Sequence, residues 1–517
     1  MKKLKALCLA TIMLFAFGCG TVKPEDIGAN ANNTAANSDT TSETAEETVT
    51  VKFVGPGTAH EDQPRITKEI NKKLLADGLN IQFDPTFIAW DAWDQKINMM
   101  LSTGEEFDLL HVMENGVPTG SYVGRGALKP LNEHLAKVPS LQEKIKDYEW
   151  DAVTVNGKIY SVPNVWTNAM DMNGETGTVT IRTDILDKLD LPLPEDGNEI
   201  MEALKAQKEY WGDSVNIYAW DHEINRTPVW LHRTYDTWPF YVNFNNPLIY
   251  VNELGEVKSW LETEEFKMDA EYYRELYING LINPDVLSLP VDERTKAGEF
   301  GDFLAGLGSF NLVSQAGYND KGLDATVEDF FLNPNSGQYV FMPVLNSNAV
   351  PVTAENPKEA LEFLDWAYGS EKNMSLLNLG EEGIDYNSVG DGRFEYIKDS
   401  ANPDAPTYQF PTWQIGYLPN MLIDVNQTDE YVERLKAEPK NYQLSIVTGF
   451  TFDPTPVQAE YANCVAQLAT TIYPIRFGVV EYEEAYPDAI AKMKTAGLDI
   501  VIAEYERQFN KFLTEKE

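Results

Sequence analysis

Residues 49–112 read VTVKFVGPGTAHEDQPRITKEINKKLLADGLNIQFDPTFIAWDAWDQKINMMLSTGEEFDLLHV, and this stretch decides the fold class. Runs of alternating or β-branched apolar residues predict strands at 49–54, 80–87 and 107–112. Apolar residues at helical spacing predict helices at 66–75 and 93–101, with a glycine shortly after each. Strands that alternate with helices indicate an α/β fold with a mostly parallel sheet. Such sheets bind ligands at the carboxyl ends of their strands, so the loops after the three strands are the first candidates for a site.

The first nineteen residues have the order of a secretory signal: a basic start, an apolar run, and a small residue, Gly18, before Cys19. A cysteine here is typical of a bacterial lipobox, although Ala16-Phe17 replaces the usual Leu-(Ala/Ser). We therefore expect 1–18 to be a signal peptide and Cys19 to carry the acyl chains that anchor the protein to the extracytoplasmic face of the cell membrane. One alternative is an ordinary secretory signal with a chance cysteine. A transmembrane helix is disfavoured, because the apolar run is shorter than the roughly 20 residues needed.

Residues 19–48 are expected to be the lipidated cysteine followed by a disordered tether. The segment is rich in Asn, Thr, Ala, Ser and Glu, and it has too few large apolar side chains to offset the entropy of ordering. A tether of this kind would hold a folded body clear of the lipid headgroups.

Charge and cysteine content limit the possible functions. Removal of the signal leaves 38 basic against 81 acidic residues, a formal net charge of about −43, which disfavours binding to nucleic acid. Cys464 would be the one unmodified cysteine of the mature chain, so no disulfide framework is expected. It lies among apolar residues at helical spacing, which predicts a buried thiol. Residues 49–517 are too long for one ordinary core and favour two lobes.

Several short stretches, taken in order, resemble one family. They are 93–110 (WDQKINMMLSTGEEFDLL), 126–135 (GALKPLNEHL), 156–163 (NGKIYSVP), 182–189 (RTDILDKL), 357–379, 383–386 (GIDY), and 449–453 (GFTFD) with Gln508. They are similar to segments of the family 1 extracellular solute-binding lipoproteins of ABC importers, and in particular to the long Firmicutes subfamily of LipO/LplA-like sugar-binding lipoproteins. Asp190 stands where that family usually has glycine.

The resemblance implies an α/β, two-lobed periplasmic-binding-protein-like fold, in which hinge segments close the lobes on a ligand in the cleft between them. The boundaries we expect are 49–163 plus 311–378 for lobe 1, and 164–310 plus 379–517 for lobe 2, with crossings near residues 163, 310 and 378. The resemblance also implies a monomer that delivers its ligand to a membrane permease with a cytoplasmic ATPase, without catalysis.

An oligosaccharide is the expected ligand, and its chemistry suggests which residues would bind it. Flat aromatic faces can cover the C–H faces of sugar rings, while amide, carboxylate and guanidinium groups satisfy the hydroxyls. The candidates lie beside predicted strand ends, near proposed crossings, in the aromatic-rich middle of the chain or, for the last of them, in a loop between two prolines: Glu114, Asn115, Asn164, Trp166, Asn168, Trp220, Asp221, Trp230, Arg233, Asn311 and Trp413. Core packing is the alternative for each tryptophan, because tryptophan is usually at least partly buried. Four others have apolar neighbours at helical spacing and are expected in the core: Trp93, Trp211, Trp260 and Trp366.

Motifs of common catalytic and cofactor sites are missing from the sequence. His222-Glu223-Ile-Asn-Arg226 lacks the second histidine of HExxH, Gly306-Leu-Gly-Ser-Phe310 is not GxSxG, and no P-loop or GxGxxG occurs. Asp385, Asn387 and Asp391 are too irregularly spaced for a calcium loop. We therefore expect no cofactor and no metal, with a calcium site built from scattered acidic residues left open as an alternative. Two alternatives stay open: the same fold with a peptide ligand, and a surface glycoside hydrolase or lyase, whose two carboxylates need no local motif.

Overall fold

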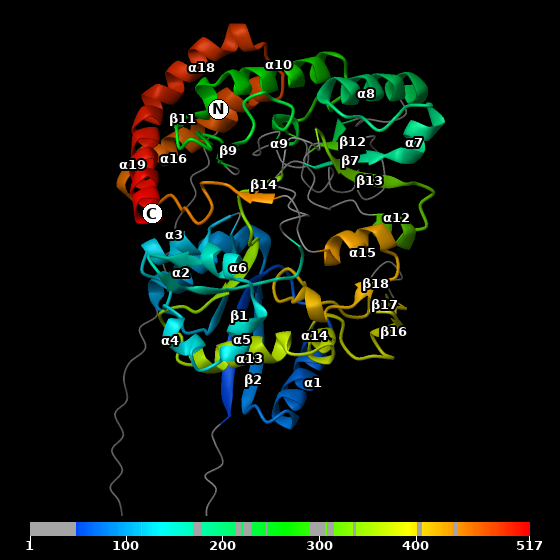
Figure 1. Cartoon of the computed structure of the whole chain (residues 1–517), viewed down its shortest axis with the longest axis vertical. Coiled ribbons are helices and arrows are strands. Elements are labelled where there is room, and N and C mark those ends of the chain that lie inside the picture. Colours follow the sequence, from blue (N-terminus) through cyan, green and yellow to red (C-terminus); the bar gives the residue numbers. More distant parts are fainter. Residues whose placement is uncertain are drawn as a thin grey trace, which may run out of the picture. The chain divides into compact units, whose positions relative to one another are not determined.

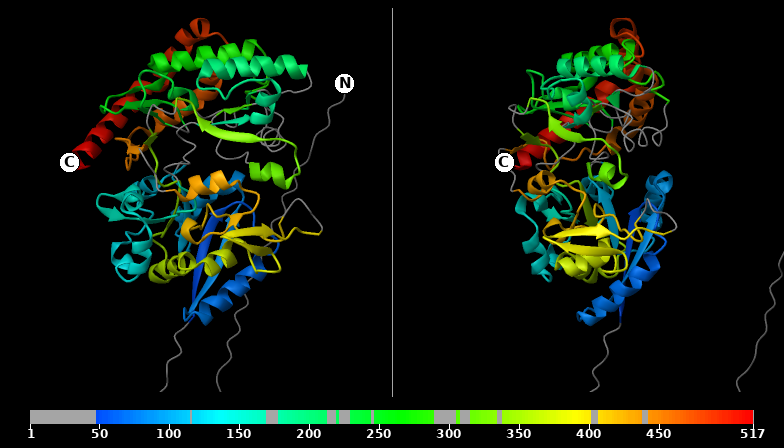
Figure 2. Two further views of the ribbon diagram at one scale, coloured as in Figure 1. Left: turned by 45° about the vertical axis from the view of Figure 1, so that its right-hand side comes forward. Right: turned by 90° about the vertical axis from the view of Figure 1, so that its right-hand side faces the viewer.

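The computed structural model describes residues 48–114, 116–168, 178–212, 219–220, 229–243, 246–288, 305–307, 315–333, 338–400, 406–437 and 442–516. These residues fall in one compact unit, within which the elements build two lobes, each around sheets of its own (Figures 1 and 2). Both lobes combine helices with sheets, as an α/β fold requires.

Lobe 1 is built on a five-stranded sheet in the order β2-β1-β3-β15-β6. Its strands are β1 (Val49–Pro56), β2 (Ile81–Ile88), β3 (Leu109–Met113), β15 (Asn346–Ala349) and β6 (Ser161–Pro163). β2 and β3 pair with β1 in parallel, whereas β15 runs antiparallel to both β3 and β6. The three strands predicted from the sequence and their parallel pairing are thus confirmed.

The sheet of lobe 1 is buried on both faces, since successive strand residues point to opposite sides. Phe53 of β1 shares a buried cluster with Ile70 of α1, while the next residue, Val54, belongs to a second cluster with Ile97 of α2. The helices of this part are α1 (Gln63–Ala76), α2 (Trp93–Thr103), α3 (Thr119–Gly124), α4 (Asn132–Leu135), α5 (Pro139–Lys144), α6 (Asp147–Ala152), α13 (Pro357–Tyr368) and α14 (Glu371–Asn378). A hairpin of β4 (Thr154–Val155) and β5 (Lys158–Ile159) precedes β6.

Residues 379–400 and 406–437 also belong to lobe 1, and the expectation that they form part of lobe 2 is wrong. Tyr408, Phe410 and Ile415 lie in the same buried cluster as Phe53, and the ring centroids of Phe410 and Phe53 are 6.1 Å apart. The remaining elements of this region are β16 (Tyr386–Gly390), β17 (Arg393–Tyr396), β18 (Ile423–Asp424) and α15 (Asp429–Lys436). The segment that follows α14 therefore packs on lobe 1, because its aromatic rings are buried against β1.

Lobe 2 has one large hydrophobic core. Its first sheet has the order β13 (Val327–Phe331), β7 (Thr178–Arg182), β12 (Ala305–Leu307) and β8 (Ala219–Trp220), and its second the order β11 (Val257–Ser259), β10 (Ile249–Asn252) and β9 (Phe240–Val242). The helices are α7 (Thr183–Lys188), α8 (Gly197–Trp211), α9 (Val229–His232), α10 (Glu264–Ile278), α12 (Gln315–Asp320), α16 (Gln458–Gln467), α17 (Tyr473–Arg476), α18 (Tyr482–Ala496) and α19 (Leu498–Lys516). Because β13 pairs with β7, residues 327–331 lie in lobe 2 and not, as expected, in lobe 1.

The described elements of the two lobes follow one another along the chain with three crossings between the lobes. The first follows β6, where the sequence predicted a crossing near residue 163. The second joins β14 (Gln338–Val340) to β15, and the third joins α15 to β19 (Tyr442–Leu444), which pairs in parallel with β14. The crossings expected near 310 and 378 therefore lie instead between β14 and β15 and between α15 and β19, as a consequence of the two boundary corrections.

Cys464 is fully buried in the core of lobe 2, which confirms the prediction of a buried thiol. Burial raises the pKa of this thiol to about 11. The thiolate is the reactive form of cysteine, so Cys464 is a packing residue at neutral pH.

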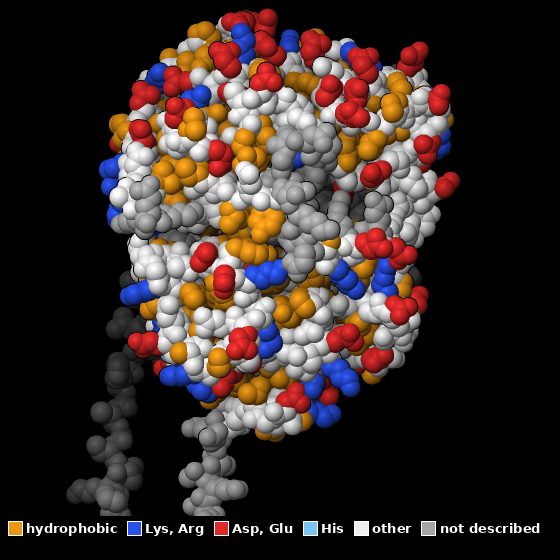
Figure 3. Space-filling model, viewed as in Figure 1, with side chains coloured by type: hydrophobic (Ala, Val, Ile, Leu, Met, Phe, Trp, Pro, Cys, Tyr) orange, Lys and Arg blue, Asp and Glu red, His pale blue; other side chains and the backbone are white. Residues whose placement is uncertain are grey.

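Acidic and basic side chains are interspersed over both lobes on the face drawn in Figure 3. Among the helices that the structure describes, none is both long enough and apolar enough to cross a bilayer.

The packing of Phe410 against β1 gives a first prediction. Phe410→Ala should lower the free energy of unfolding by about 3–5 kcal/mol, because it leaves a cavity where the 406–417 segment meets the core of lobe 1. Urea denaturation followed by circular dichroism measures this loss. Leu254→Ala is the control, since Leu254 is 84% exposed and its truncation should change little. A loss in Phe410→Ala as small as in the control would contradict the placement of this segment.

Candidate functional site

The carboxyl ends of the parallel strands in lobe 1 meet a loop from far along the chain. Gln414 of this loop donates a hydrogen bond of 2.6 Å from Nε2 to the carbonyl oxygen of Pro56, the last residue of β1. Tyr417 forms a β-bridge with Val165, just after β6. The loop 411–417 is thus fixed at the edge of the sheet where α/β proteins bind their ligands.

Trp90 and Trp413 form an aromatic surface at this edge. Their ring centroids are 5.7 Å apart and the ring planes are inclined by 27°. Trp90 begins a 3-10 turn (Trp90–Ala92) after β2 and is 57% exposed. His111 of β3 meets Trp413 edge-on, with ring centroids 5.1 Å apart. Two nearly parallel indoles, one of them open to solvent, offer a flat apolar face of the kind on which the C–H groups of a sugar ring can pack.

Asn164 holds the Trp413 loop in place through its side-chain amide. Asn164 Nδ2 donates to the carbonyl oxygens of Trp413 at 2.5 Å and of Thr412 at 3.2 Å, and Asn164 Oδ1 accepts from the backbone N–H of Gly416 at 2.6 Å. The side chain is buried. Asn164 therefore positions Trp413.

Trp166 is tied to the same edge by a polar chain. Its Nε1 donates to Asn346 Oδ1 at 3.0 Å, and Asn346 Nδ2 lies 3.3 Å from His111 Nε2. Burial lowers the pKa of His111 to about 3, so the imidazole is neutral at physiological pH. A neutral ring suits a buried position against the edge of Trp413.

Trp166 also lines a pocket of about 250 Å³ beside the Trp413 loop. Thr412, the residue before Trp413, is part of the same wall. Further aromatic and polar side chains of lobe 1 complete the lining, among them Phe394, Tyr396, Tyr431, Asn378, Gln409, Asp424 and Gln427. The pocket thus extends the aromatic edge with rings and amide groups together.

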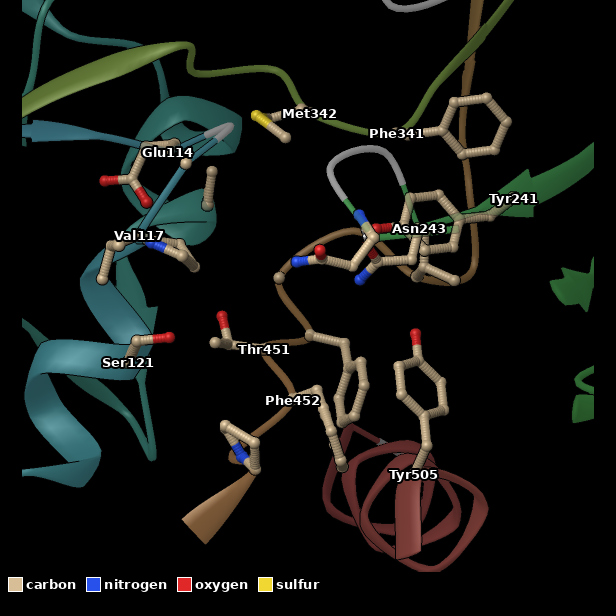
Figure 4. Close-up of a pocket in the computed structure, with 18 of the residues that line it drawn as sticks. Glu114, Val117, Ser121, Tyr241, Asn243, Phe341, Met342, Thr451, Phe452 and Tyr505 are labelled. Carbon is tan, nitrogen blue, oxygen red and sulfur yellow. Dashed lines mark hydrogen bonds between the residues drawn. The ribbon is translucent and has the colours of Figure 1, made fainter. Parts of the chain in front are cut away.

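A second cavity, of about 340 Å³, lies between the lobes (Figure 4). Val117 and Ser121 face it from the α3 side, and Tyr241, Asn243 and Tyr505 face it from lobe 2. Phe341 and Met342 of the second crossing and Thr451 and Phe452 of the C-terminal region also line it.

Glu114 lies on the wall of this second cavity, but its carboxylate is turned toward lobe 1. Oε1 accepts hydrogen bonds from Thr119 Oγ1 at 2.6 Å and Ser347 Oγ at 2.5 Å, and Oε2 accepts from the backbone N–H of Thr119 at 2.9 Å. Burial raises the pKa of Glu114, while these three donors act in the opposite direction.

The second cavity and the tryptophan pair lie on opposite sides of the sheet edge. Asn346 of β15 points to Trp166, and the next residue, Ser347, points to Glu114. Since neighbouring residues of a strand point to opposite faces, the crossing that leads into β15 separates the two regions.

Residues 59–374 match the family model for bacterial extracellular solute-binding proteins. The chain belongs to this family of bacterial extracellular solute-binding proteins. The family that the sequence segments resemble is thereby confirmed. Residues 446–514, which include α16 to α18 and most of α19, match a domain family of unknown function (DUF3502).

Known proteins resemble this solute-binding protein over nearly its whole length. A carbohydrate ABC transporter substrate-binding protein of Streptococcus pneumoniae is 22% identical and the match covers 100% of both chains. Lipoprotein LipO of Bacillus subtilis is 22% identical over 87% of this chain and 90% of its own. The crystal structure of NgtS, an N-glycan transport solute-binding protein of Streptococcus pneumoniae, matches with a TM-score of 0.71 at 18% identity and covers 90% of this chain and 100% of NgtS. That likeness confirms the two-lobed fold.

The structure brings together part of the candidate site. Asn164, Trp166 and Trp413 meet at the edge of lobe 1, as described above. Asn168 lies nearby, where its Nδ2 donates to the carbonyl oxygen of Ala437 at 2.9 Å, just after α15. Glu114 is on the other side of the edge, so the expected grouping of Glu114 with Trp166 is not what the structure has.

Trp230 and Arg233 are core residues, which corrects their expected contact with ligand. Trp230 is fully buried, with its ring centroid 5.6 Å from that of Tyr272, and Arg233 Nε donates to the carbonyl oxygen of Leu332. His232 is equally buried, with Nε2 2.9 Å from Asp269 Oδ2. Side chains at these positions fill lobe 2 and do not reach its surface.

The other candidates lie outside the described residues: Cys19, Asn115, Asp221, Asn311 and the side chain of Trp220, whose backbone forms part of β8. Trp93, Trp260 and Trp366 are buried, which confirms the expectation that they pack in cores, and the side chain of Trp211 is likewise outside the described residues.

Trp90, His111 and Asn346 are not among the site residues predicted from the sequence. The position of Trp90 after a predicted strand, at the binding edge of the sheet, is visible in the sequence. Asn346 and His111 could not be identified from the sequence, because their contact depends on the pairing of β15 with β3, two strands that are far apart in sequence.

The neutral state of His111 predicts a dependence of stability on pH. Its folded pKa is lowered from 6.5 to about 3, so the unfolded chain binds this proton first as the pH falls. The stability that the neutral His111 contributes is fully present above pH 6.5. As the pH falls from 6.5 to about 3, the free energy of unfolding decreases by up to about 1.4 kcal/mol per pH unit. His111→Phe keeps an aromatic ring against Trp413 and removes the titration.

Urea denaturation at several pH values from 7 downward tests this expectation. The free energy of unfolding of the parent should fall more steeply with decreasing pH than that of His111→Phe. Parallel pH profiles for the two proteins would show that the imidazole is not held neutral in the folded state.

Proposed function

We propose that the protein captures an oligosaccharide on the Trp90–Trp413 pair and in the adjoining pocket, and delivers it to the permease of an ABC importer. The single observation that carries this proposal is the stacked indole pair at the binding edge of lobe 1, in which Trp90 is 57% exposed. Closure of lobe 2 over this edge would remove the sugar from water, in the manner of hinge-bending binding proteins.

The surroundings of the pair suit a sugar better than an apolar ligand. Buried sugar hydroxyls need hydrogen-bond partners, and amides such as those of Asn378, Gln409 and Gln427 line the adjoining pocket. The carbohydrate relative and the N-glycan transport protein point to the same class of ligand through their names.

Binding without catalysis is the second part of the proposal. Glycosidases use two carboxyl groups on either side of the scissile bond. The described lining of the pocket beside Trp413 contains one, Asp424. Membership of a solute-binding family also favours capture and release over turnover.

The third part of the proposal concerns location. Cys19 would be diacylated and would hold the protein on the extracytoplasmic face of the membrane, where a permease and its ATPase are the partners. The order of residues 1–19 and the likeness to a lipoprotein support this anchor. The protein would act as a monomer.

Thermal shift of the purified protein against a panel of oligosaccharides, peptides and calcium tests the ligand class. An oligosaccharide at 100 times its Kd should add about 2.7 kcal/mol of stability, and chromatography should recover that glycan intact. A shift in melting temperature with peptides alone would identify a peptide as the ligand, without contradicting the fold. Cleavage of the glycan would make the protein a hydrolase or lyase.

Truncation of the indole pair tests the site. Trp90→Ala and Trp413→Ala should each weaken binding of the responding oligosaccharide about tenfold or more, roughly 1.4 kcal/mol, because each removes part of the stacking surface. Isothermal titration measures the change. Tyr210→Ala is the control, since Tyr210 is 56% exposed on α8 in lobe 2. Equal affinities for the parent and both tryptophan variants would place the ligand elsewhere.

Substitution of Cys19 tests the anchor. Cys19→Ser should move the protein from the membrane fraction to the soluble fraction of bacteria that express it, and should abolish incorporation of labelled palmitate. Labelled palmitate in the variant would show that another residue is acylated.

A further inference from the structure

We propose that the cavity of about 340 Å³ beside α3 is a second carbohydrate site, which takes a short sugar and opposes closure of the lobes at the tryptophan pair. The effect on closure rests on the function proposed above, whereas binding in the cavity does not.

The walls of the cavity come from both lobes. Val117, Ser121 and Ala152 belong to lobe 1, while Tyr241 and Asn243 belong to lobe 2. A ligand that fills this space would therefore touch both lobes at once.

The C-terminal region closes one end of the cavity by direct contact with α3. A methyl group at Gly120 would lie 2.6 Å from Thr451 Oγ1, so Thr451 packs on the helix backbone where glycine leaves room. Asp453 similarly lies next to Gly124. The lobes thus touch beside the cavity in this conformation.

The lining has the two kinds of group that a sugar requires. Aromatic rings are supplied by Tyr241, Phe341, Phe450, Phe452, Tyr461 and Tyr505. Asn243 and Asn246 contribute amides, and Ser121 and Thr451 contribute hydroxyls. The volume is near the lower end of the ~300–1,000 Å³ typical of small-molecule sites, which favours a short sugar over a long oligosaccharide.

Glu114 and Arg125 are the charged side chains of the described lining, and their charges are of opposite sign. Glu114 is engaged by Thr119 and Ser347 inside lobe 1, and Arg125 Nη1 donates to Asn98 Oδ1 at 2.9 Å. A neutral sugar therefore fits this cavity better than a charged ligand.

The position of the cavity determines its effect on the tryptophan pair. The two regions lie on opposite sides of the crossing into β15, so a rotation that brings the lobes together at Trp413 separates them at Ser121. A sugar that bridges both walls at Ser121 stabilises the opposite rotation. By linkage, the two ligands then weaken each other's binding by the same factor.

Isothermal titration with glucose, mannose, N-acetylglucosamine and maltose tests the second site. In the Trp90→Ala/Trp413→Ala double variant, at least one of these sugars should still bind. Adding Tyr241→Ala should abolish that binding, because Tyr241 supplies an open wall of the cavity, while adding Tyr210→Ala should not. If the double variant binds none of the short sugars that the parent binds, the proposal of a second site is overturned. So would failure of every short sugar to bind the parent, even where a long oligosaccharide still binds at the first site.

Filling the cavity tests the coupling without a second ligand. Ser121→Tyr places a ring between the walls and should weaken binding of the long oligosaccharide about fivefold or more, as should a saturating short sugar in the parent. An unchanged melting temperature verifies that the variant is folded. Unchanged oligosaccharide affinity in both experiments would overturn the coupling.

Discussion

The hydrogen bonds between Asn164 and the backbone of residues 412–416 are the interaction on which the candidate site depends. Asn164 follows β6, just before the chain first crosses from lobe 1 to lobe 2. The Trp413 loop lies in the later part of lobe 1, which follows the crossing back from lobe 2. A buried amide that bonds at both ends fixes the loop in one register, because leaving either end unpaired would cost about 1–3 kcal/mol. Through this bond Trp413 is held against Trp90, and the flat surface exists before any ligand arrives.

A preformed surface of this kind loses little conformational entropy on binding, since few side chains must be ordered when the ligand docks. The moving part is then the lobe and not the stacking surface. Lobe 2 is joined to lobe 1 by three crossings, and the second of them also forms a wall of the cavity beside α3. The second crossing would therefore take part both in closure over the ligand at the indole pair and in the effect of a sugar bound in the cavity beside α3. Thr451 and Tyr505, which line that cavity, belong to the region that matches a domain of unknown function.

The sequence predicted those features that depend on neighbours along the chain. Strands β1, β2 and β3 and the helices between them follow from local periodicity, and the family follows from short segments in a fixed order. The lobe boundaries could not be predicted in this way, because Phe410 belongs to lobe 1 only through its contact with Phe53, far away in sequence. For the same reason the pairing of Trp413 with Trp90 could not be predicted, and Trp230 was assigned to a binding surface although its ring is buried in a core.

A crystal structure of the protein with a bound oligosaccharide tests the central claim most directly. We expect a sugar ring that lies against the indole of Trp90 or Trp413, with its C–H face toward the aromatic ring and its hydroxyls toward the amides of the adjoining pocket. An oligosaccharide bound only in the cavity beside α3, or one that touches neither indole, would contradict capture at the indole pair.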